Sequence, residues 1–299
     1  MSSFDAKHAV VLMAYGSPER LEDVPAYYAD IRGGRPIRPD LMDDLVARYR
    51  ALGIDDESPL NAITEQTRAA LGQELGGVPV FTGMKHWTPR IAEAAERALA
   101  TSADTIVGLV LAPHYSSLSI AGYREQLEAA LAGRAQLLFI DSWHDDPAFV
   151  DVLADRIRGT AAHVVFTAHS LPARILEEGD PYRDQLLETA ELVAGRAGVR
   201  DWSFSFQSES PTGEPWLGPD ILDHLEDLHA RGVRNVLVCP VGFVADHLEI
   251  RWDLDREARD KADELGIEFA RIEMPNASPA FVRVLARLVR RTLAVPSGA

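Results

Sequence analysis

The chain has 299 residues, a length that suits one large domain or two ordinary ones. Of these residues 46% are hydrophobic and 25% are charged, which is the composition of a globular protein with a sizeable core. Its formal net charge of −16 argues against nucleic-acid binding, because that function requires clustered Lys and Arg. Cys239 is the single cysteine and cannot form an internal disulfide. No apolar run approaches the roughly 18 residues of a membrane helix, and residues 1–8 lack an apolar signal segment, so we expect a cytoplasmic protein without a membrane span.

Short apolar runs alternate with longer stretches of helical periodicity along the chain, a pattern typical of parallel α/β structure. In the first half we predict strands over residues 9–15, 78–83, 105–112 and 136–140, and helices over residues 65–75, 90–100, 121–132 and 147–158. The predicted strands are apolar almost throughout, as expected for strands that are buried on both faces of a sheet.

The second half repeats this pattern. Strands are predicted over residues 163–168, 202–206, 235–241 and 267–272, and helices over residues 184–197, 219–230, 253–265 and 279–293. The strand that ends at Tyr15 aligns in sequence with the strand that ends at His169, which indicates an internal duplication. We therefore predict an α/β protein with two duplicated Rossmann-like, doubly wound parallel-sheet lobes around a cleft. The lobes are expected at residues 1–143 and 144–278, with a C-terminal helix and tail at 279–299 that packs on one of them.

The carboxyl ends of the predicted strands carry candidate ligand-binding side chains, because ligands of open parallel sheets bind there. His169 ends the first strand of the second half, and Glu249 follows the third strand of that half. An imidazole and a carboxylate form a mixed nitrogen and oxygen site that suits a divalent metal. With only two protein ligands, the site suits a metal in transit better than a structural metal. For His169 alone, the alternative is a structural histidine that bonds a backbone carbonyl.

Acidic residues continue beyond Glu249. Asp253 and Glu257 follow at successive i+4 steps, so the three carboxylates share one face of a helix. Like charges at this spacing repel by roughly a few tenths of a kcal/mol per pair. Two interpretations stay open: a metal relay, or a solvated face whose acids pair with the nearby arginines at positions 251, 256 and 259.

Aromatic and basic residues cluster in the first half. Residues 27–35 combine aromatic rings, arginines and glycines, and Arg48, Tyr49 and Ser58 follow. Such a set suits a flat, apolar ligand with anionic groups, because Arg pairs with carboxylates and aromatic faces cover rings; a plain solvated surface is the alternative. Residues 83–90 form a second polar cluster that either caps a helix or binds ligand carboxylates. No Gly-rich phosphate loop or GxSxG element occurs, which argues against nucleotide and serine-hydrolase chemistry.

Four spaced motifs, at residues 13–18, 167–172, 216–220 and 241–249, together resemble those of ferrochelatases, and the likeness spans nearly the whole chain. Tyr15 makes the chain most similar to the coproporphyrin III ferrochelatases of Gram-positive bacteria. The resemblance implies insertion of Fe²⁺ into coproporphyrin III, which gives coprohaem in haem biosynthesis. It also implies that His169 and Glu249 bind iron and remove the pyrrole protons, and that Tyr15 is an axial ligand to iron in the product.

The same resemblance implies which residues hold the porphyrin and its carboxylates. These are Tyr15, Arg32, Arg48, Tyr49, Ser58 and Tyr123. Matching Ser58 to the family crosses a short insertion at residues 55–57. We expect His169 to be the better proton acceptor, since neutral imidazole is available near pH 7, while its division of labour with Glu249 stays open.

No permanently bound cofactor is implied, and Fe²⁺ is a substrate. We do not expect the 2Fe–2S cluster of some actinobacterial relatives, because such a cluster needs about four thiolates. The expected partners are the porphyrin tetracarboxylate, Fe²⁺ and, transiently, other haem-pathway enzymes, and the compact relatives suggest a monomer. The alternatives are a protoporphyrin IX ferrochelatase, a chelatase for cobalt or another tetrapyrrole, and a non-catalytic tetrapyrrole-binding protein.

Overall fold

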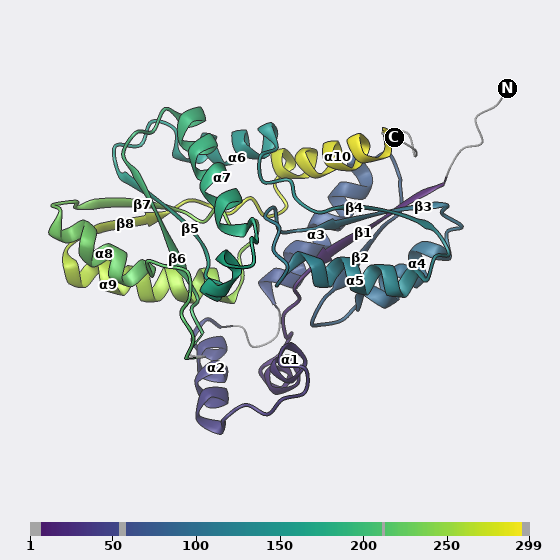
Figure 1. Ribbon diagram of the computed structural model, residues 1–299, viewed down its shortest axis with the longest axis horizontal. Helices are drawn as coiled ribbons and strands as arrows, with labels where there is room; N and C mark the ends of the chain where they lie inside the picture. Colours follow the sequence, from purple (N-terminus) through teal and green to yellow (C-terminus); the bar gives the residue numbers. More distant parts are fainter. Residues whose placement is uncertain (1–6, 54–57, 211–212, 295–299) are drawn as a thin grey trace. The chain divides into compact units, whose positions relative to one another are not determined.

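The computed structural model describes residues 7–53, 58–210 and 213–294 (Figure 1). Contacts within the chain divide it into two units. The first comprises Met1–Ala112, Ser117–Asp141 and Asn276–Ala299, and the second comprises Pro113–Ser116 and Ser142–Pro275. The short segment 113–116 thus belongs to the second unit.

The first unit is built on a parallel sheet with the strand order β2-β1-β3-β4. Its strands are β1 (His8–Ala14), β2 (Val80–Met84), β3 (Thr105–Val110) and β4 (Gln136–Ile140). Because β1 pairs with β2 on one side and β3 on the other, it lies at the centre of the sheet. Its near-continuous apolar sequence follows from this position, since both of its faces are covered.

The helices of the first unit are α1 (Val24–Ile31), α2 (Pro39–Ala51), α3 (Pro59–Glu74), α4 (Ile91–Leu99), α5 (Ile120–Leu131) and α10 (Pro279–Ala294), and a short 3₁₀ turn, η1 (Leu21–Asp23), precedes α1. Of these, α3, α4, α5 and α10 pack against the sheet. Right-handed crossovers place α3 on one face and α4 and α5 on the other. The C-terminal helix α10 packs beside α3, so it belongs to the first unit.

The sequence did not predict helices α1 and α2, and it predicted the start of α3 too late. We did not predict α1 and α2, because they bury only Val24, Tyr27 and Tyr49 and therefore show no apolar stripe. Helix α3 begins at Pro59 instead of residue 65, because Ser58 caps it and proline is well suited to the first helical turn. The predicted insertion at residues 55–57 lies outside the described residues.

The second unit repeats the architecture with the strand order β6-β5-β7-β8. Its strands are β5 (His163–His169), β6 (Trp202–Gln207), β7 (Asn235–Cys239) and β8 (Glu268–Arg271). Its helices are α6 (Pro147–Ile157), η2 (Ala173–Leu176), α7 (Tyr182–Ala197), α8 (Ile221–Ala230), η3 (Ile250–Ala258) and α9 (Arg259–Leu265). In both sheets the first strand is central, the second lies on one side, and the third and fourth lie on the other. This shared order confirms the predicted duplicated, doubly wound α/β fold.

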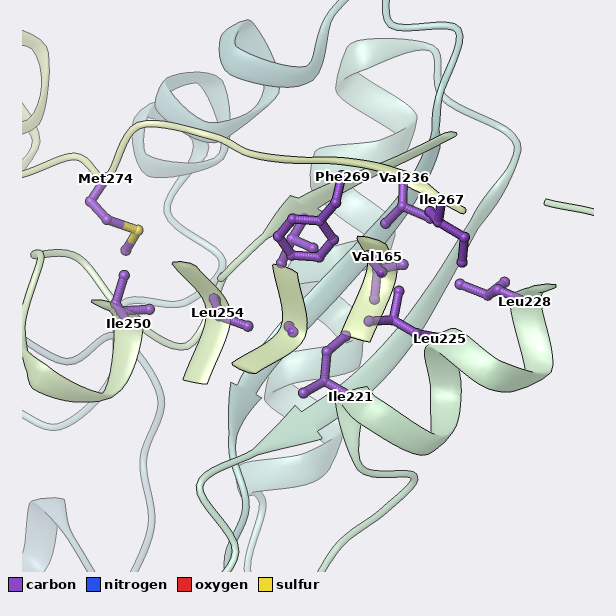
Figure 2. Close-up of a cluster of buried hydrophobic side chains, with 13 residues drawn as sticks. Val165, Ile221, Leu225, Leu228, Val236, Ile250, Leu254, Ile267, Phe269 and Met274 are labelled. Carbon is purple, nitrogen blue, oxygen red and sulfur yellow. The ribbon is translucent and has the colours of Figure 1, made fainter. Parts of the chain in front are cut away.

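The core beneath α8 and η3 holds the second sheet and these helices together (Figure 2). Val165 and Val236 of the sheet meet Leu225 of α8 and Leu254 of η3 in one buried cluster. Burying each such side chain contributes on the order of 1.5–3 kcal/mol, so η3 is firmly fixed beside the sheet. Its position matters, because Glu249 immediately precedes it.

The segment after Glu249 differs from the prediction. An α-helix was expected over residues 253–265, but the structure has a π-helix, η3, followed by the short α-helix α9. The indole Nε1 of Trp252 donates to the Glu257 carboxylate at 2.6 Å, a contact between residues five apart. Apolar periodicity cannot distinguish a π-turn from an α-turn over nine residues. Such turns occur often at functional sites.

Candidate active site

His169 and Glu249 lie close together in the second unit. His169 is the last residue of β5, and Glu249 follows the loop that leaves β7, the neighbouring strand. The His169 Nε2 and Glu249 Oε1 atoms are 3.6 Å apart, and the two side chains are 31% and 39% exposed. The structure therefore brings together the two candidate metal ligands at the carboxyl end of the sheet and leaves both accessible.

His247 is a neighbour of this pair that our sequence reasoning did not single out. Its Nε2 atom lies 3.4 Å from the second carboxylate oxygen of Glu249, and its Nδ1 atom lies 2.9 Å from the Ala245 carbonyl oxygen. Glu249 thus lies between two imidazoles. The available signal was the position of His247 two residues before Glu249, but the fold of the loop decides which way its ring points.

The charge state of the pair follows from its geometry. Burial by itself lowers the pKa of His169, but the adjacent Glu249 carboxylate outweighs burial and raises that pKa to about 9. Burial likewise raises the pKa of Glu249, but His169 and His247 hold it well below its usual range. At pH 7 the metal-free site therefore contains an imidazolium and a carboxylate. Our expectation of a neutral imidazole near pH 7 does not hold in this state, because it assumed an isolated histidine.

Asp253 lies one turn into η3 and is nearly buried. The Ser208 hydroxyl donates a hydrogen bond to its carboxylate. Burial, reinforced by the negative charges of Glu249 and Glu257, raises the pKa of Asp253 to about 7. The acids along η3 therefore interact with one another, and Asp253 can gain or lose a proton near neutral pH.

Two of the three arginines that could have neutralised this face, Arg256 and Arg259, contact aromatic rings. The Arg256 guanidinium lies over the Trp252 ring at 5.6 Å. The Arg259 guanidinium lies over the Phe269 ring at 5.4 Å and donates to the backbone oxygen of the same residue. Within the part of the chain that the structure describes, no three His, Cys, Asp or Glu side chains form a group that could hold a metal ion.

The backbone around His169 is packed tightly. A Cβ atom placed on Gly242 would lie 2.6 Å from the Cβ atom of Ala168, so the loop after β7 rests directly on the end of β5. The Nδ1 atom of His169 faces the Ser170 carbonyl oxygen, which leaves Nε2 toward Glu249. The Tyr182 hydroxyl donates to the His169 backbone oxygen at 3.0 Å. Burial raises the pKa of Tyr182, so its hydroxyl stays protonated.

Tyr15 and Tyr123 belong to an aromatic cluster in the first unit. Tyr15 follows β1 and is 41% exposed, and its ring lies 4.6 Å from the His86 ring. Tyr123 of α5 is buried, and the Lys85 amine lies over its ring at 4.8 Å. Lys85 also donates to the Ser119 backbone oxygen at 3.0 Å. This cluster combines an exposed ring with a largely buried cation.

The other predicted porphyrin-binding residues lie on and near α1, α2 and α3. Arg32 follows α1 and donates to the Arg35 backbone oxygen at 3.4 Å. On α2, Arg48 pairs with Asp44 at 3.0 Å, and Tyr49 is buried. Ser58 is also buried, where it caps α3. Of this set, Tyr15 and Arg32 are exposed.

The polar cluster at residues 83–90 is organised around one carboxylate of α1. Two guanidinium nitrogens of Arg90 each lie 3.0 Å from an oxygen of Asp30, and the His86 Nδ1 atom lies 2.9 Å from the same group. Asp30 therefore fixes α1 to the turn after β2. The Glu93 carboxylate also accepts a hydrogen bond from the Arg90 backbone N–H at 2.7 Å at the start of α4, so helix capping, one of the two interpretations, does occur here.

The fold and the strand-end pair define the class of protein: a duplicated parallel α/β protein with an imidazole and a carboxylate 3.6 Å apart at the carboxyl end of one sheet. The solved structure of SirB from Bacillus subtilis with Fe³⁺ is similar in fold, with a TM-score of 0.62, 12% identity and 96% of both chains covered. The family model described as Ferrochelatase matches residues 7–293. The chain belongs to the ferrochelatase family, whose members are metal-inserting chelatases.

Curated relatives cover almost the whole chain. A protein named "Ferrochelatase" from Herpetosiphon aurantiacus is 43% identical, over 95% of this chain and 98% of that protein. A protein named "Coproporphyrin III ferrochelatase" from Halalkalibacterium halodurans is 41% identical, over 96% of this chain and 98% of that protein.

Among the described residues, no helix has both the length and the apolarity needed to cross a membrane.

Proposed function

We propose that the protein inserts Fe²⁺ into coproporphyrin III, with His169 and Glu249 as the ligands that deliver the ion. The observation that carries this proposal is the 3.6 Å approach of His169 Nε2 to Glu249 Oε1 at an accessible strand end. Coproporphyrin III is favoured over protoporphyrin IX because relatives such as the Halalkalibacterium halodurans protein carry that substrate in their names. Protoporphyrin IX remains the alternative, since the Herpetosiphon aurantiacus relative is named without a porphyrin.

In this mechanism, metal insertion is an exchange of protons for iron. A porphyrin ring must bend before a metal can enter, and it must lose two N–H protons. Fe²⁺ requires a neutral imidazole, so its binding displaces the proton that His169 holds in the metal-free site. When iron moves on to the ring, His169 is left neutral beside the Glu249 carboxylate. Its high proton affinity then makes it the acceptor of one pyrrole proton.

A second acceptor is needed for the other pyrrole proton. Asp253 suits this role, because its pKa of about 7 allows both protonation states at neutral pH. Its interaction with Glu249 connects it to the site, and Glu257 continues the acidic path along η3. We propose that these two acids carry protons or incoming iron between the solvent and the pair.

The porphyrin-binding role proposed for the first unit rests on residue chemistry. Arginine guanidinium groups pair with carboxylates, and aromatic rings cover the macrocycle. The proposed set is Tyr15, Arg32, Arg48, Tyr49, Ser58 and Tyr123. The accessible Tyr15 is the proposed axial ligand to iron in the product. We propose that no cofactor is permanently bound; a 2Fe–2S cluster would need about four thiolates, and Cys239 is the only cysteine in the sequence.

The test is an anaerobic assay with Fe²⁺ and excess coproporphyrin III, followed by the change in the porphyrin absorption spectrum. We expect many turnovers per protein, and His169→Ala should abolish turnover while porphyrin binding, measured by fluorescence quenching, persists. His229→Ala, on α8 of the same unit, is the matched control and should retain turnover. Turnover retained in His169→Ala would overturn the role of the pair, and conversion that stops at one equivalent would indicate a binding protein.

The substrate is tested separately by competition. Coproporphyrin III and protoporphyrin IX are supplied at equal concentration with limiting Fe²⁺, and the two iron complexes are separated by chromatography. We expect the coproporphyrin product to predominate. A predominance of the protoporphyrin product would establish the alternative substrate without affecting the assignment of His169.

A further inference from the structure

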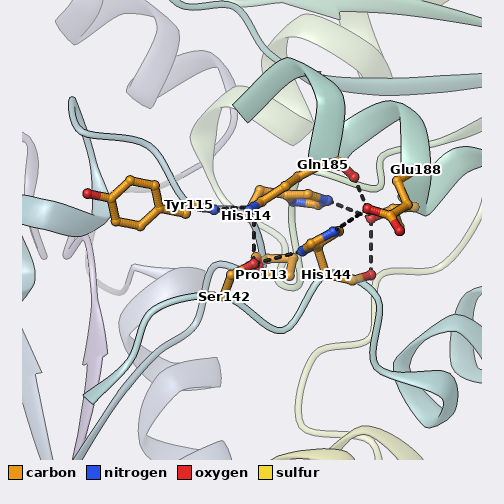
Figure 3. Close-up of polar contacts among 8 residues, drawn as sticks. Pro113, His114, Tyr115, Ser142, His144, Gln185 and Glu188 are labelled. Atoms are coloured by element: carbon orange, nitrogen blue, oxygen red, sulfur yellow. Dashed lines mark hydrogen bonds and ion pairs between the residues drawn. The ribbon is translucent and has the colours of Figure 1, made fainter. Parts of the chain in front are cut away.

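The beginning of helix α7 is held by hydrogen bonds to the segment Pro113–Ser116. These contacts lie within the second unit, and Figure 3 shows the part around His114, Tyr115 and Gln185. The bonded pairs are Ser116 Oγ with Asp180 Oδ2 at 3.0 Å, Tyr115 N with Gln185 Oε1 at 2.7 Å, and His114 Nε2 with Thr189 Oγ1 at 2.9 Å. They fix α7 from just before its first turn to its middle.

A second segment strengthens this anchoring. His144 lies 2.9 Å from a Glu188 carboxylate oxygen through Nε2 and 2.8 Å from the Ser142 hydroxyl through Nδ1 (Figure 3). Thr189 donates to the His144 backbone oxygen at 3.1 Å. The bonds of Thr189 to His114 and to His144 are buried and fix one arrangement, because breaking either leaves a costly unpaired group. Helix α7 is therefore a rigid support.

Tyr182, in the first turn of α7, connects this support to the candidate active site. Its hydroxyl donates to the His169 backbone oxygen at 3.0 Å, and its ring packs edge-on against the His114 ring at 6.4 Å. The register between β5 and β7 ends at Phe166, so the last residues of β5 pair within the sheet only with β6. Beyond β6, the end of β5 is held by the loop after β7, through Gly242, and by the Tyr182 hydroxyl.

We propose that Tyr182 is a positioning residue for metal delivery, whose hydroxyl holds the His169 backbone so that the imidazole faces Glu249. This inference rests on the proposed function, because it assumes that His169 receives the metal. Partners that bond the second ring nitrogen of a metal-binding histidine typically change metal affinity by about 10- to 100-fold when they are removed, and a bond to the histidine backbone, one step further from the metal, is expected to act at the lower end of that range. A hydroxyl that acts only on stability would change the unfolding temperature without a selective effect on the metal.

The test compares Tyr182→Phe, which removes only the hydroxyl, with the full-length wild-type protein. Co²⁺ serves as a spectroscopic probe of the site, and Fe²⁺ insertion is measured in parallel. We expect Co²⁺ binding to weaken about tenfold and the KM for Fe²⁺ to rise by a similar factor, with an altered Co²⁺ ligand-field spectrum. The KM for the porphyrin should not change. Tyr115→Phe is the matched control, because Tyr115 contacts α7 through its backbone N–H.

Several outcomes would overturn the proposal. One is a folded Tyr182→Phe protein whose Co²⁺ affinity stays within twofold of wild type, and another is a parallel rise of both KM values. If Tyr182→Phe does not fold, Ser116→Ala tests the same support, because it removes the bond to Asp180 just before α7. An unchanged Co²⁺ affinity of Ser116→Ala would also contradict the proposal. If His169→Ala still bound Co²⁺ and turned over, the proposed function would fail instead, so the two failures are distinguishable.

Discussion

Replacing Glu249 by Gln removes one negative charge from the candidate active site with little change in shape. In the wild-type protein, Glu249 holds the pKa of His169 at about 9, compared with 6.5 for an ordinary histidine. A rise of this size corresponds to roughly 3 kcal/mol at about 1.36 kcal/mol per pH unit. Because the two side chains are 31% and 39% exposed, solvent screening reduces the net contribution to stability, to about 1–2 kcal/mol.

The direct assay is NMR titration of the His169 ring, assigned by its loss in His169→Ala. In Glu249→Gln we expect the pKa of His169 to fall to 6.5 or below, because burial is then opposed only by weaker interactions. A midpoint that remains above 8 in the variant would refute the reasoning, since some other group would then hold the proton.

The same change has a predicted pH window for stability. The raised pKa of His169 stabilises the fold fully below pH 6.5, and this contribution is lost as the pH rises through about 9. The lowered pKa of Glu249 stabilises the fold above pH 4.5, and this contribution is lost as the pH falls below that value. Urea unfolding should therefore show the largest destabilisation of Glu249→Gln between pH 4.5 and 6.5 and little at pH 10. Equal destabilisation at pH 6 and pH 10 would contradict the charge pairing.

Two further substitutions test the packing and the buried histidines. Gly242→Ala places a Cβ atom 2.6 Å from that of Ala168, so we expect a loss of about 1–3 kcal/mol in unfolding free energy and slower turnover. Gly195→Ala, in open space on α7, is the control and should be neutral or slightly stabilising. Equal effects of the two substitutions would rule out the steric argument. Burial holds the pKa of His114 well below 6.5, so acid destabilises the wild-type fold below that pH as the unfolded chain takes up a proton. His114→Asn should flatten this loss between pH 6.5 and 5 in urea titrations, and an unchanged slope would count against it.

The fold was largely predictable because its strands are buried on both faces. A central strand such as β1 reads as one apolar run, and the alternation of such runs with helices leaves few arrangements other than a parallel sheet. Helices α1 and α2 were missed for the opposite reason, since they bury too few residues to create a periodic pattern. The π-helix η3 was missed because its hydrogen-bond register leaves no separate trace in the apolar spacing.

The candidate site was predictable in part. His169 and Glu249 could be placed together because both follow strands of one parallel sheet, and parallel strands end at the same edge. The proximity of His247 was not predictable, because it depends on the path of a loop. The protonation of His169 was predicted wrongly for the free site, since it is set by a 3.6 Å distance that sequence spacing does not fix.

Charge balance gives the arrangement a physical rationale within the proposed mechanism. In the metal-free site His169 carries one proton, and Asp253, with a pKa of about 7, carries a second for part of the time at neutral pH. Fe²⁺ can replace these two protons without changing the net charge of a partly buried site. The porphyrin then takes the ion and returns two protons, so the second exchange is also electroneutral. Separating charge in a poorly solvated site is costly. His169 and Asp253, with pKa values near or above 7 beside the strongly acidic Glu249, therefore lower the cost of both the binding of iron and its transfer to the porphyrin.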